Sequence, residues 1–153
     1  MARELRKTGI SVIGDVPWGT HLCHFYETKE DLLDILIPYF KTGLKNNEFC
    51  VWVVSDPLGE EEARNALRQA VPSADRYLAA GHIEICSHIV FPSSRQQPSQ
   101  AGRIEIVPHT EWYLKGGAFV AERVIEGWNE KLADALAKGY AGLRSNRVAG
   151  TTV

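Results

Sequence analysis

The sequence lacks the features that mark membrane-bound and secreted proteins. No apolar stretch approaches the roughly 18–20 residues needed to cross a bilayer, and residues 1–19, MARELRKTGISVIGDVPWG, have no apolar centre like that of a signal peptide. These two absences predict a cytoplasmic protein. Its three cysteines, Cys23, Cys50 and Cys86, show no CxxC spacing, and their odd number argues against structural disulfides in that compartment.

A surplus of positive charge is also missing. The chain of 153 residues has 17 Lys and Arg against 19 Asp and Glu, and its basic residues form no run or stripe. Proteins that read nucleic acid directly carry such a patch, so we expect no nucleic acid as a direct partner. The length predicts one domain, residues 1–153, with a hydrophobic core of ordinary size.

The glycine-rich loops that hold phosphates or activate a nucleophile are absent. A first apolar segment, HLCHFYE at 21–27, leads into ETKEDLLD, which has no glycine and whose acids would repel an anion. No GxGxxG or GxSxG motif occurs, and no glycine elbow surrounds Ser55 beside Asp56. The sequence therefore predicts neither a nucleotide hydrolase nor a serine hydrolase, and we expect a non-catalytic protein without a cofactor.

Strand-like and helix-like segments alternate along the chain. Short apolar runs predict strands at 21–27, 49–55, 82–87 and 140–145, and helical spacing predicts helices at 28–47, 56–71, 73–81 and 118–139. FCVWVVS, residues 49–55, is apolar throughout apart from its last residue, which is typical of a strand buried on both faces. This alternation predicts an α/β fold with a mostly parallel sheet and flanking helices.

Two of the expected helices carry clear positional signals. Thr28 is a good N-cap with Asp31 three residues later, and Pro38 should bend the same helix because it lacks an N–H. In the helix at 118–139, apolar residues recur at helical spacing and would share one face. They are Val120, Val124, Trp128, Leu132 and Leu136.

One segment is repeated. GHIEICSH begins at Gly81 and GRIEIVPH begins at Gly102, with a Ser, Pro and Gln-rich loop between them at about 86–102. The main interpretation is a local duplication that forms two antiparallel or adjacent strands. A flap over a pocket and a chance similarity are the alternatives.

The first apolar segment places His21, Cys23 and His24 within four positions. In a strand, His21 and Cys23 share one face and His24 lies on the other. A zinc ion would therefore need further ligands from elsewhere, such as Cys86, His88 or His109. Three readings stay open: a plain strand with Cys23 buried, a metal or redox sensor using His21 and Cys23, and a ligand contact from His21 or Tyr26. Cys50, inside an apolar strand, is expected to be inert.

Ligands of open parallel sheets bind beyond the carboxyl ends of the strands. The strand ends nominate aromatic and polar side chains that suit a small ligand. These candidates are His21, Tyr26, Ser55, Asp56, His109, Trp112 and Arg144. Several also have a structural explanation, since Ser55 and Asp56 could begin a helix, Trp112 could be core and Arg144 could pair with a surface carboxylate.

Three segments together resemble one known family. PWGTHLCHFYETKEDLLDILIPYFKTGLKNNEFCVWVVSDPL, GRIEIVPHTEWYLKGGAF and GYAGLR resemble the MEDS domain, the methanogen/methylotroph sensory domain, over about 17–144. The resemblance implies a sensory domain for simple hydrocarbon derivatives, found alone or joined to histidine kinases and transcription regulators. It also implies a reduced RecA/KaiC-type α/β fold without a phosphate loop. His21 and Tyr26 belong to the family's first-strand motif, and His109 and Trp112 belong to its PHTEWY segment.

The chain departs from this family in two places. The family usually has one G-x-I-E-I strand where this chain has two, and it continues past GLR with a TGN-like turn where this chain reads SNRVAGTTV. We therefore expect an exposed sheet edge and a homo-oligomer that covers it. The alternatives to a sensor of small organic molecules are the metal or redox sensor, a degenerate nucleotide-binding protein and a dimerisation module.

Overall fold

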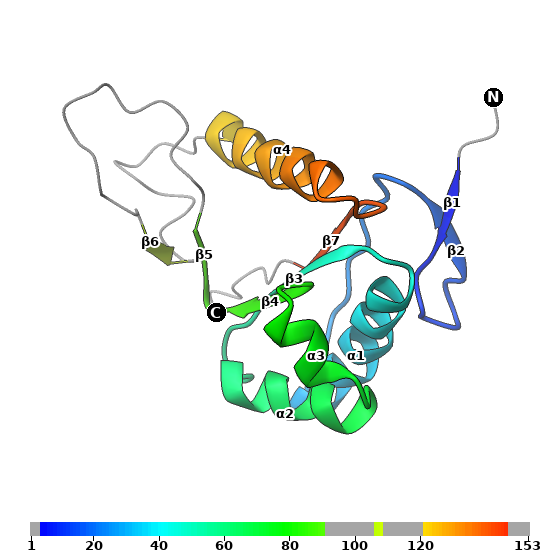
Figure 1. Ribbon diagram of the computed structural model, residues 1–153. Coiled ribbons are helices and arrows are strands. Elements are labelled where there is room, and N and C mark those ends of the chain that lie inside the picture. The colour runs from blue at the N-terminus through cyan, green and yellow to red at the C-terminus, as the bar shows by residue number, and fades with distance from the viewer. Residues whose placement is uncertain (1–3, 91–105, 109–120, 147–153) are drawn as a thin grey trace.

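The computed structural model describes residues 4–90, 106–108 and 121–146 (Figure 1). At 88–90, 106–108 and 121–124 it describes the backbone alone. The elements are β1 Leu5–Lys7, β2 Asp15–Pro17, α1 Lys29–Lys45, β3 Phe49–Val53, α2 Glu60–Ala70, α3 Ala74–Ala79, β4 Ile83–Cys86, β5 His88–Val90, β6 Ile106–Pro108, α4 Ala121–Ala137 and β7 Leu143–Ser145. Among these helices, none combines the length and the apolar character that passage through a bilayer demands.

A three-stranded parallel sheet forms the centre of the fold. Its strand order is β4-β3-β7, and β3 is parallel to both neighbours. Two small antiparallel pairs, β1 with β2 and β5 with β6, stand beside it. The expected α/β class with a parallel sheet and flanking helices is confirmed.

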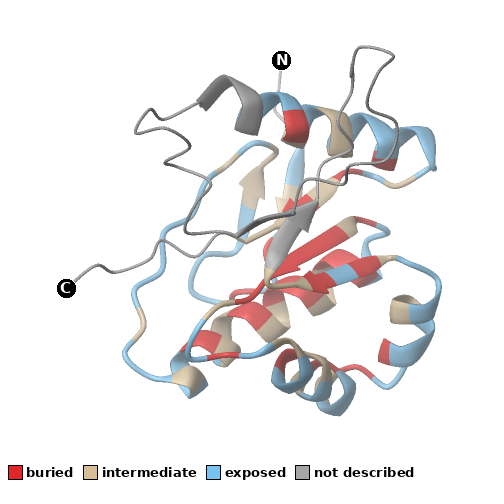
Figure 2. Cartoon of the chain, turned by 90° about the vertical axis from the view of Figure 1, so that its left-hand side faces the viewer, coloured by how far each residue is buried: buried red, intermediate tan, exposed pale blue. Residues whose placement is uncertain are grey.

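Helices cover both faces of this sheet. Figure 1 shows α1, α2 and α3 on one face and α4 on the other. Along β3, Cys50 and Trp52 belong to the core cluster under α1 and α2, whereas Val51 and Val53 pack with Trp128 of α4. Both sets are buried, which explains the unbroken apolar run of this strand. Figure 2 shows the buried residues gathered in the central strands and on the helix sides that face them.

Helix α1 begins as the sequence predicts. The hydroxyl of Thr28 accepts a hydrogen bond from Asp31 N at 3.1 Å, and the Asp31 carboxylate accepts one from Thr28 N at 3.0 Å. The capping box therefore forms with Asp in place of Glu. Hydrogen bonds from the side chain and then the backbone of Thr28 to the Asp31 carboxylate hold its pKa below the usual value. Pro38 lies inside the helix, also as expected.

The strand expected at 21–27 is wrong. Residues 21–26 have neither helix nor strand structure, and His21, Cys23 and His24 are exposed. The physical reason is the strand order, because β3 already has β4 on one side and β7 on the other. No place beside the most buried strand remains for a further segment. The interpretation of Cys23 as a buried strand residue is therefore also wrong.

An N-terminal hairpin takes a place that the sequence did not indicate. Strands β1 and β2 pair antiparallel, with Leu5 opposite Pro17. Gly9, at the turn, approaches α1 so closely that a Cβ would lie 2.3 Å from the Pro38 carbonyl oxygen, and its φ of +81° favours glycine. The hairpin escaped prediction because its strands are three residues long and lack alternating apolar residues.

Helix α4 is confirmed, but its expected apolar face is only partly right. Trp128 packs on the sheet, whereas Leu132 and Leu136 are 37% and 50% exposed. Among residues 125–137, whose side chains the structure describes, the buried positions are Gly127 and Ala135, because small residues let the helix approach the sheet. Val120 and the side chain of Val124 lie outside the described residues.

The two copies of the repeated segment occupy different sheets. Strand β4, from the first copy, pairs with β3, and β6, from the second, pairs with β5. The outer edge of β4 is engaged instead by a side chain, since Arg64 donates to the Ile85 carbonyl at 2.9 Å. Within the described part of the chain the copies therefore do not pair with one another.

Candidate functional site

The carboxyl ends of the three parallel strands meet the starts of α1 and α2. We call this region the carboxyl edge and define it by Tyr26, Ser55, Asp56, Ser87 and Asn146. The first turns of α1 and α2 are joined there, because Lys29 Nζ forms an ion pair with Glu62. This is the edge at which open parallel sheets bind their ligands.

Two residues after β3 present unengaged polar side chains at this edge. Ser55 is half-buried and Asp56 is exposed. The Ser55 carbonyl accepts from Leu58 N at 2.9 Å, which turns the chain toward α2. Among the described residues, neither side chain has a hydrogen-bond or ion-pair partner, so both remain available to a ligand.

The loops after β4 and β7 are held by side chains that sequence reasoning missed. Glu60 Oε1, in the first turn of α2, accepts from Ser87 N at 2.7 Å and from Ser87 Oγ at 2.8 Å. Asn146 donates to the Val53 carbonyl at 2.9 Å and accepts from Val53 N at 2.8 Å. Its amide thus continues the β3–β7 ladder by one step. The only signal for it is an Asn directly after the last strand.

Tyr26 and His21 differ in burial, although both belong to the first apolar segment. Tyr26 is half-buried and packs against the core cluster under α1, near the start of that helix. His21 is exposed, and so is Cys23. Within the described ranges, no three His, Cys, Asp or Glu side chains come close enough together to hold a metal ion. Nothing there adds ligands to the metal site considered for His21 and Cys23.

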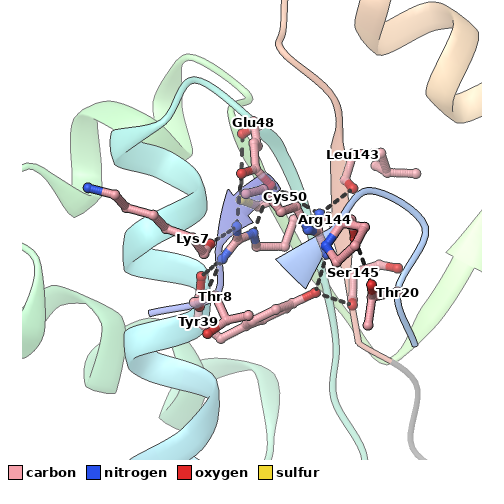
Figure 3. Close-up of polar contacts among 11 residues, drawn as sticks. Lys7, Thr8, Thr20, Tyr39, Glu48, Cys50, Leu143, Arg144 and Ser145 are labelled. Atoms are coloured by element: carbon pink, nitrogen blue, oxygen red, sulfur yellow. Dashed lines mark hydrogen bonds and ion pairs between the residues drawn. The ribbon is translucent and has the colours of Figure 1, made fainter. Parts of the chain in front are cut away.

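Arg144 does not lie at the carboxyl edge. It is paired with Cys50 in the β3–β7 register, near the start of β3, and it is fully buried. Figure 3 shows its guanidinium surrounded by acceptors. Nε and Nη2 donate to the two carboxylate oxygens of Glu48, each at 2.8 Å, and the remaining N–H groups donate to the carbonyls of Thr8, Tyr39 and Lys7 at 3.1, 2.6 and 2.6 Å.

All five donors of Arg144 are therefore used inside the protein. Its partner is a carboxylate, as the structural explanation expected, but Glu48 is only 2% exposed and is not a surface group. Gly43 of α1 makes room for this arrangement, because a Cβ there would lie 2.7 Å from Arg144 Cδ. Sequence reasoning missed Glu48, whose one signal is a charged residue directly before a buried strand.

The outer edge of β7 is covered by side chains from the same region. Arg6 donates to the Leu143 carbonyl at 3.4 Å, and the Tyr39 hydroxyl donates to the Ser145 carbonyl at 3.3 Å. Arg6 also donates to Glu48 at 3.3 Å. These bonds engage the two outward carbonyls of β7, so that edge is less open to another strand than expected. The homo-oligomer itself stays a prediction.

Cys50 lies beside Arg144 in the core and is buried. Burial raises the pKa of its thiol to about 12, although the Arg144 charge acts in the opposite direction. A thiol that stays protonated is a poor nucleophile. The prediction of an inert core cysteine agrees with this position. His109 and Trp112 lie outside the described residues, and their ligand contacts stay predictions.

The sequence matches the model of one known protein family. Residues 20–100 and 92–146 match the family described as MEDS: MEthanogen/methylotroph, DcmR Sensory domain. The two matched segments overlap at 92–100, within the stretch between the repeated copies. Neither the curated proteins nor the solved structures contain a significant match. Because the matched segments together span most of the sequence, the chain belongs to the MEDS family of sensory domains.

Proposed function

We propose that this sensory domain binds a small, weakly polar, hydrocarbon-derived molecule at the carboxyl edge and has no catalytic activity of its own. The observation that carries the proposal is the contrast within that edge. Tyr26 offers a half-buried aromatic surface, while Ser55 and Asp56 have polar side chains without partners in the described structure. An aromatic wall with few polar anchors suits a small organic ligand.

Charge at this edge favours an uncharged ligand. Glu27, Glu30 and Asp31 precede or begin α1, and all three are exposed. A nucleotide phosphate would meet these acids instead of a glycine-rich cradle. We propose that the fold is a reduced relative of the RecA/KaiC type in which this loop has been lost, and the parallel sheet with helices on both faces supports that kinship.

Signalling follows if the ligand prefers one of two conformations or association states. We propose that the bound state is passed to a histidine kinase or a transcription regulator, and that two or more copies associate. His109 and Trp112, from the PHTEWY segment, would complete the ligand contacts.

A thermal-shift screen tests the proposal. Short alcohols, ethers, ketones and haloalkanes are added to the full chain, and a ligand at 100 times its Kd should stabilise it by about 2.7 kcal/mol, or about 5–10 °C in Tm. Tyr26→Ala should abolish the shift, whereas Phe25→Ala, at an adjacent aromatic that is 90% exposed, should retain it. Stabilisation by ATP and magnesium alone, or stoichiometric zinc in the purified protein, would contradict the proposal.

A further inference from the structure

The indole of Trp52 is the most unusual polar group in the core. Trp52 is fully buried, and its Nε1–H has no hydrogen-bond partner in the part of the chain that the structure describes. Its ring stacks on Phe40 of α1, with centroids 5.1 Å apart. Buried polar groups in proteins nearly always have partners, so an unpaired donor at this depth needs an explanation.

The place of Trp52 in the fold connects it to the carboxyl edge. It is the penultimate residue of β3 and faces α1, two residues before Val54 and three before Ser55. Helix α1 leads through a short turn into β3, so the start of α1 lies near the end of that strand. Tyr26, just before α1, packs against the core cluster that contains Trp52.

The segment that carries Tyr26 is weakly held. Residues 21–26 form no helix or strand, and their backbone makes no hydrogen bond to another described residue. Of these six residues, Tyr26 alone packs against the described core cluster, and its ring lies 6.2 Å from that of His24 within the same segment. Moving Tyr26 outward therefore breaks few contacts and uncovers part of the core cluster to which Trp52 belongs.

We propose that Trp52 Nε1–H is the donor that recognises the ligand, and that the ligand is an uncharged molecule with one hydrogen-bond acceptor. The guest lies between the Tyr26 ring, which moves outward to admit it but stays in contact with it, and the Trp52 and Phe40 rings, and its acceptor atom pairs with the indole. Trp is a donor only, so it selects ethers, ketones and alcohols over hydrocarbons of the same shape. Charged guests are disfavoured because the surroundings are apolar. This inference rests on the proposed function and specifies its ligand.

A matched pair of probes tests this selection. Tetrahydrofuran and cyclopentane have five-membered rings of nearly the same size, but only tetrahydrofuran carries an acceptor. Each is titrated into the ¹⁵N-labelled full chain, and the indole N–H cross-peaks of its four tryptophans are followed by NMR. Tetrahydrofuran should move the Trp52 peak downfield and saturably, while the peak of Trp128, on the other face of the sheet, stays in place. Cyclopentane should cause no downfield shift.

Single substitutions assign the peaks and supply a second readout. Trp52→Phe keeps an aromatic ring on Phe40 and should weaken tetrahydrofuran binding at least tenfold, whereas Trp128→Phe should leave it within twofold. Should Trp52→Phe fail to fold, the Trp→Phe variants at 18, 112 and 128 assign the remaining peak by elimination, and the wild-type titration decides.

The outcomes separate this inference from the proposed function. If tetrahydrofuran raises the Tm and moves other peaks but not that of Trp52, the indole is not the recognition donor and the sensor proposal survives. Equal downfield shifts with both probes would also overturn the selection by acceptor. If neither the probes nor the wider panel moves any peak or the Tm, both proposals fail.

Discussion

At the start of β3, every N–H of Arg144 and both carboxylate oxygens of Glu48 have partners, whereas just past its end the side chains of Ser55 and Asp56 have none among the described residues. The two ends of one sheet therefore use polar residues differently. At the first, charge is buried and fully paired, which stabilises the fold. At the second, polar groups stay available, which suits recognition. Side-chain engagement, more than residue type, distinguishes the structural positions from the proposed binding positions here.

The largest expected effect comes from breaking the buried pair. Arg144→Met leaves Glu48 buried without its main partner, and we expect the free energy of unfolding to fall by about 3–5 kcal/mol in urea titrations. Arg76→Met, at an exposed arginine, should change it by less than about 0.5 kcal/mol. A loss below about 1 kcal/mol for Arg144→Met would mean that the pair does not hold this end of the sheet.

A smaller effect is expected from crowding the same pair. In Gly43→Ala the new methyl group would meet Arg144 Cδ at 2.7 Å and Cys50 Sγ at 3.0 Å, so we expect a loss of about 1–3 kcal/mol despite the better helix propensity of Ala. Lys45→Ala, exposed in the last turn of the same helix, serves as the control. A Gly43→Ala variant more stable than wild type would show that Arg144 can move aside.

Alkaline pH should lower the free energy of unfolding through the buried thiol of Cys50, near the start of β3. Burial raises the pKa of this thiol from 9.0 to about 12, so the folded protein keeps a proton that the unfolded chain releases. Stability from this group is complete below pH 9 and is lost as pH rises toward 12, by about 1.4 kcal/mol per pH unit. Urea titrations at pH 8 and pH 10 should show this loss in wild type and in Cys23→Ala, but not in Cys50→Ala.

The smallest effect on stability is expected at the carboxyl edge. Ser55→Ala should change the free energy of unfolding by less than about 0.5 kcal/mol, because its hydroxyl has no partner in the described structure. The same variant should reduce the Tm shift caused by a bound ligand, measured with the best compound of the screen. Ser73→Ala, at an exposed serine, should leave both quantities unchanged. A stability loss comparable to that of Gly43→Ala would erase the contrast between the two ends.

The sequence predicts most where local chemistry decides the structure. The Thr28 and Asp31 capping box, the apolar run of β3 and the alternation of elements all depend on neighbours in the chain, and the structure confirms them. The strand predicted at 21–27 does not form: its composition suits a strand, but both sides of β3 are already occupied. Local pattern cannot report which strands will already flank β3.

The candidate site was less predictable for the same reason. The sequence nominates Arg144 because it lies near the end of a strand-like run, but its hydrogen-bond partners are 96 to 137 residues away in the chain. Glu48 and Asn146 each carry one signal, a polar residue directly beside a strand, and that signal does not identify their partners. Ser55 and Asp56 were easier, since the end of an apolar run places them at the carboxyl edge directly.

The hydrogen bonds from Arg144 to the carbonyls of Lys7 and Thr8 also affect the order in which the protein folds during synthesis. Arg144, which binds the hairpin, is synthesised 136 and 137 residues after the two hairpin residues whose carbonyls it contacts. Contacts so distant in the chain form slowly, because the entropy cost of closing a long loop comes before the contacts contribute any stabilisation. Docking of the hairpin through these bonds thus requires β7 to have been translated and inserted, and a nascent chain cut short before β7 would leave Glu48 without its main partner.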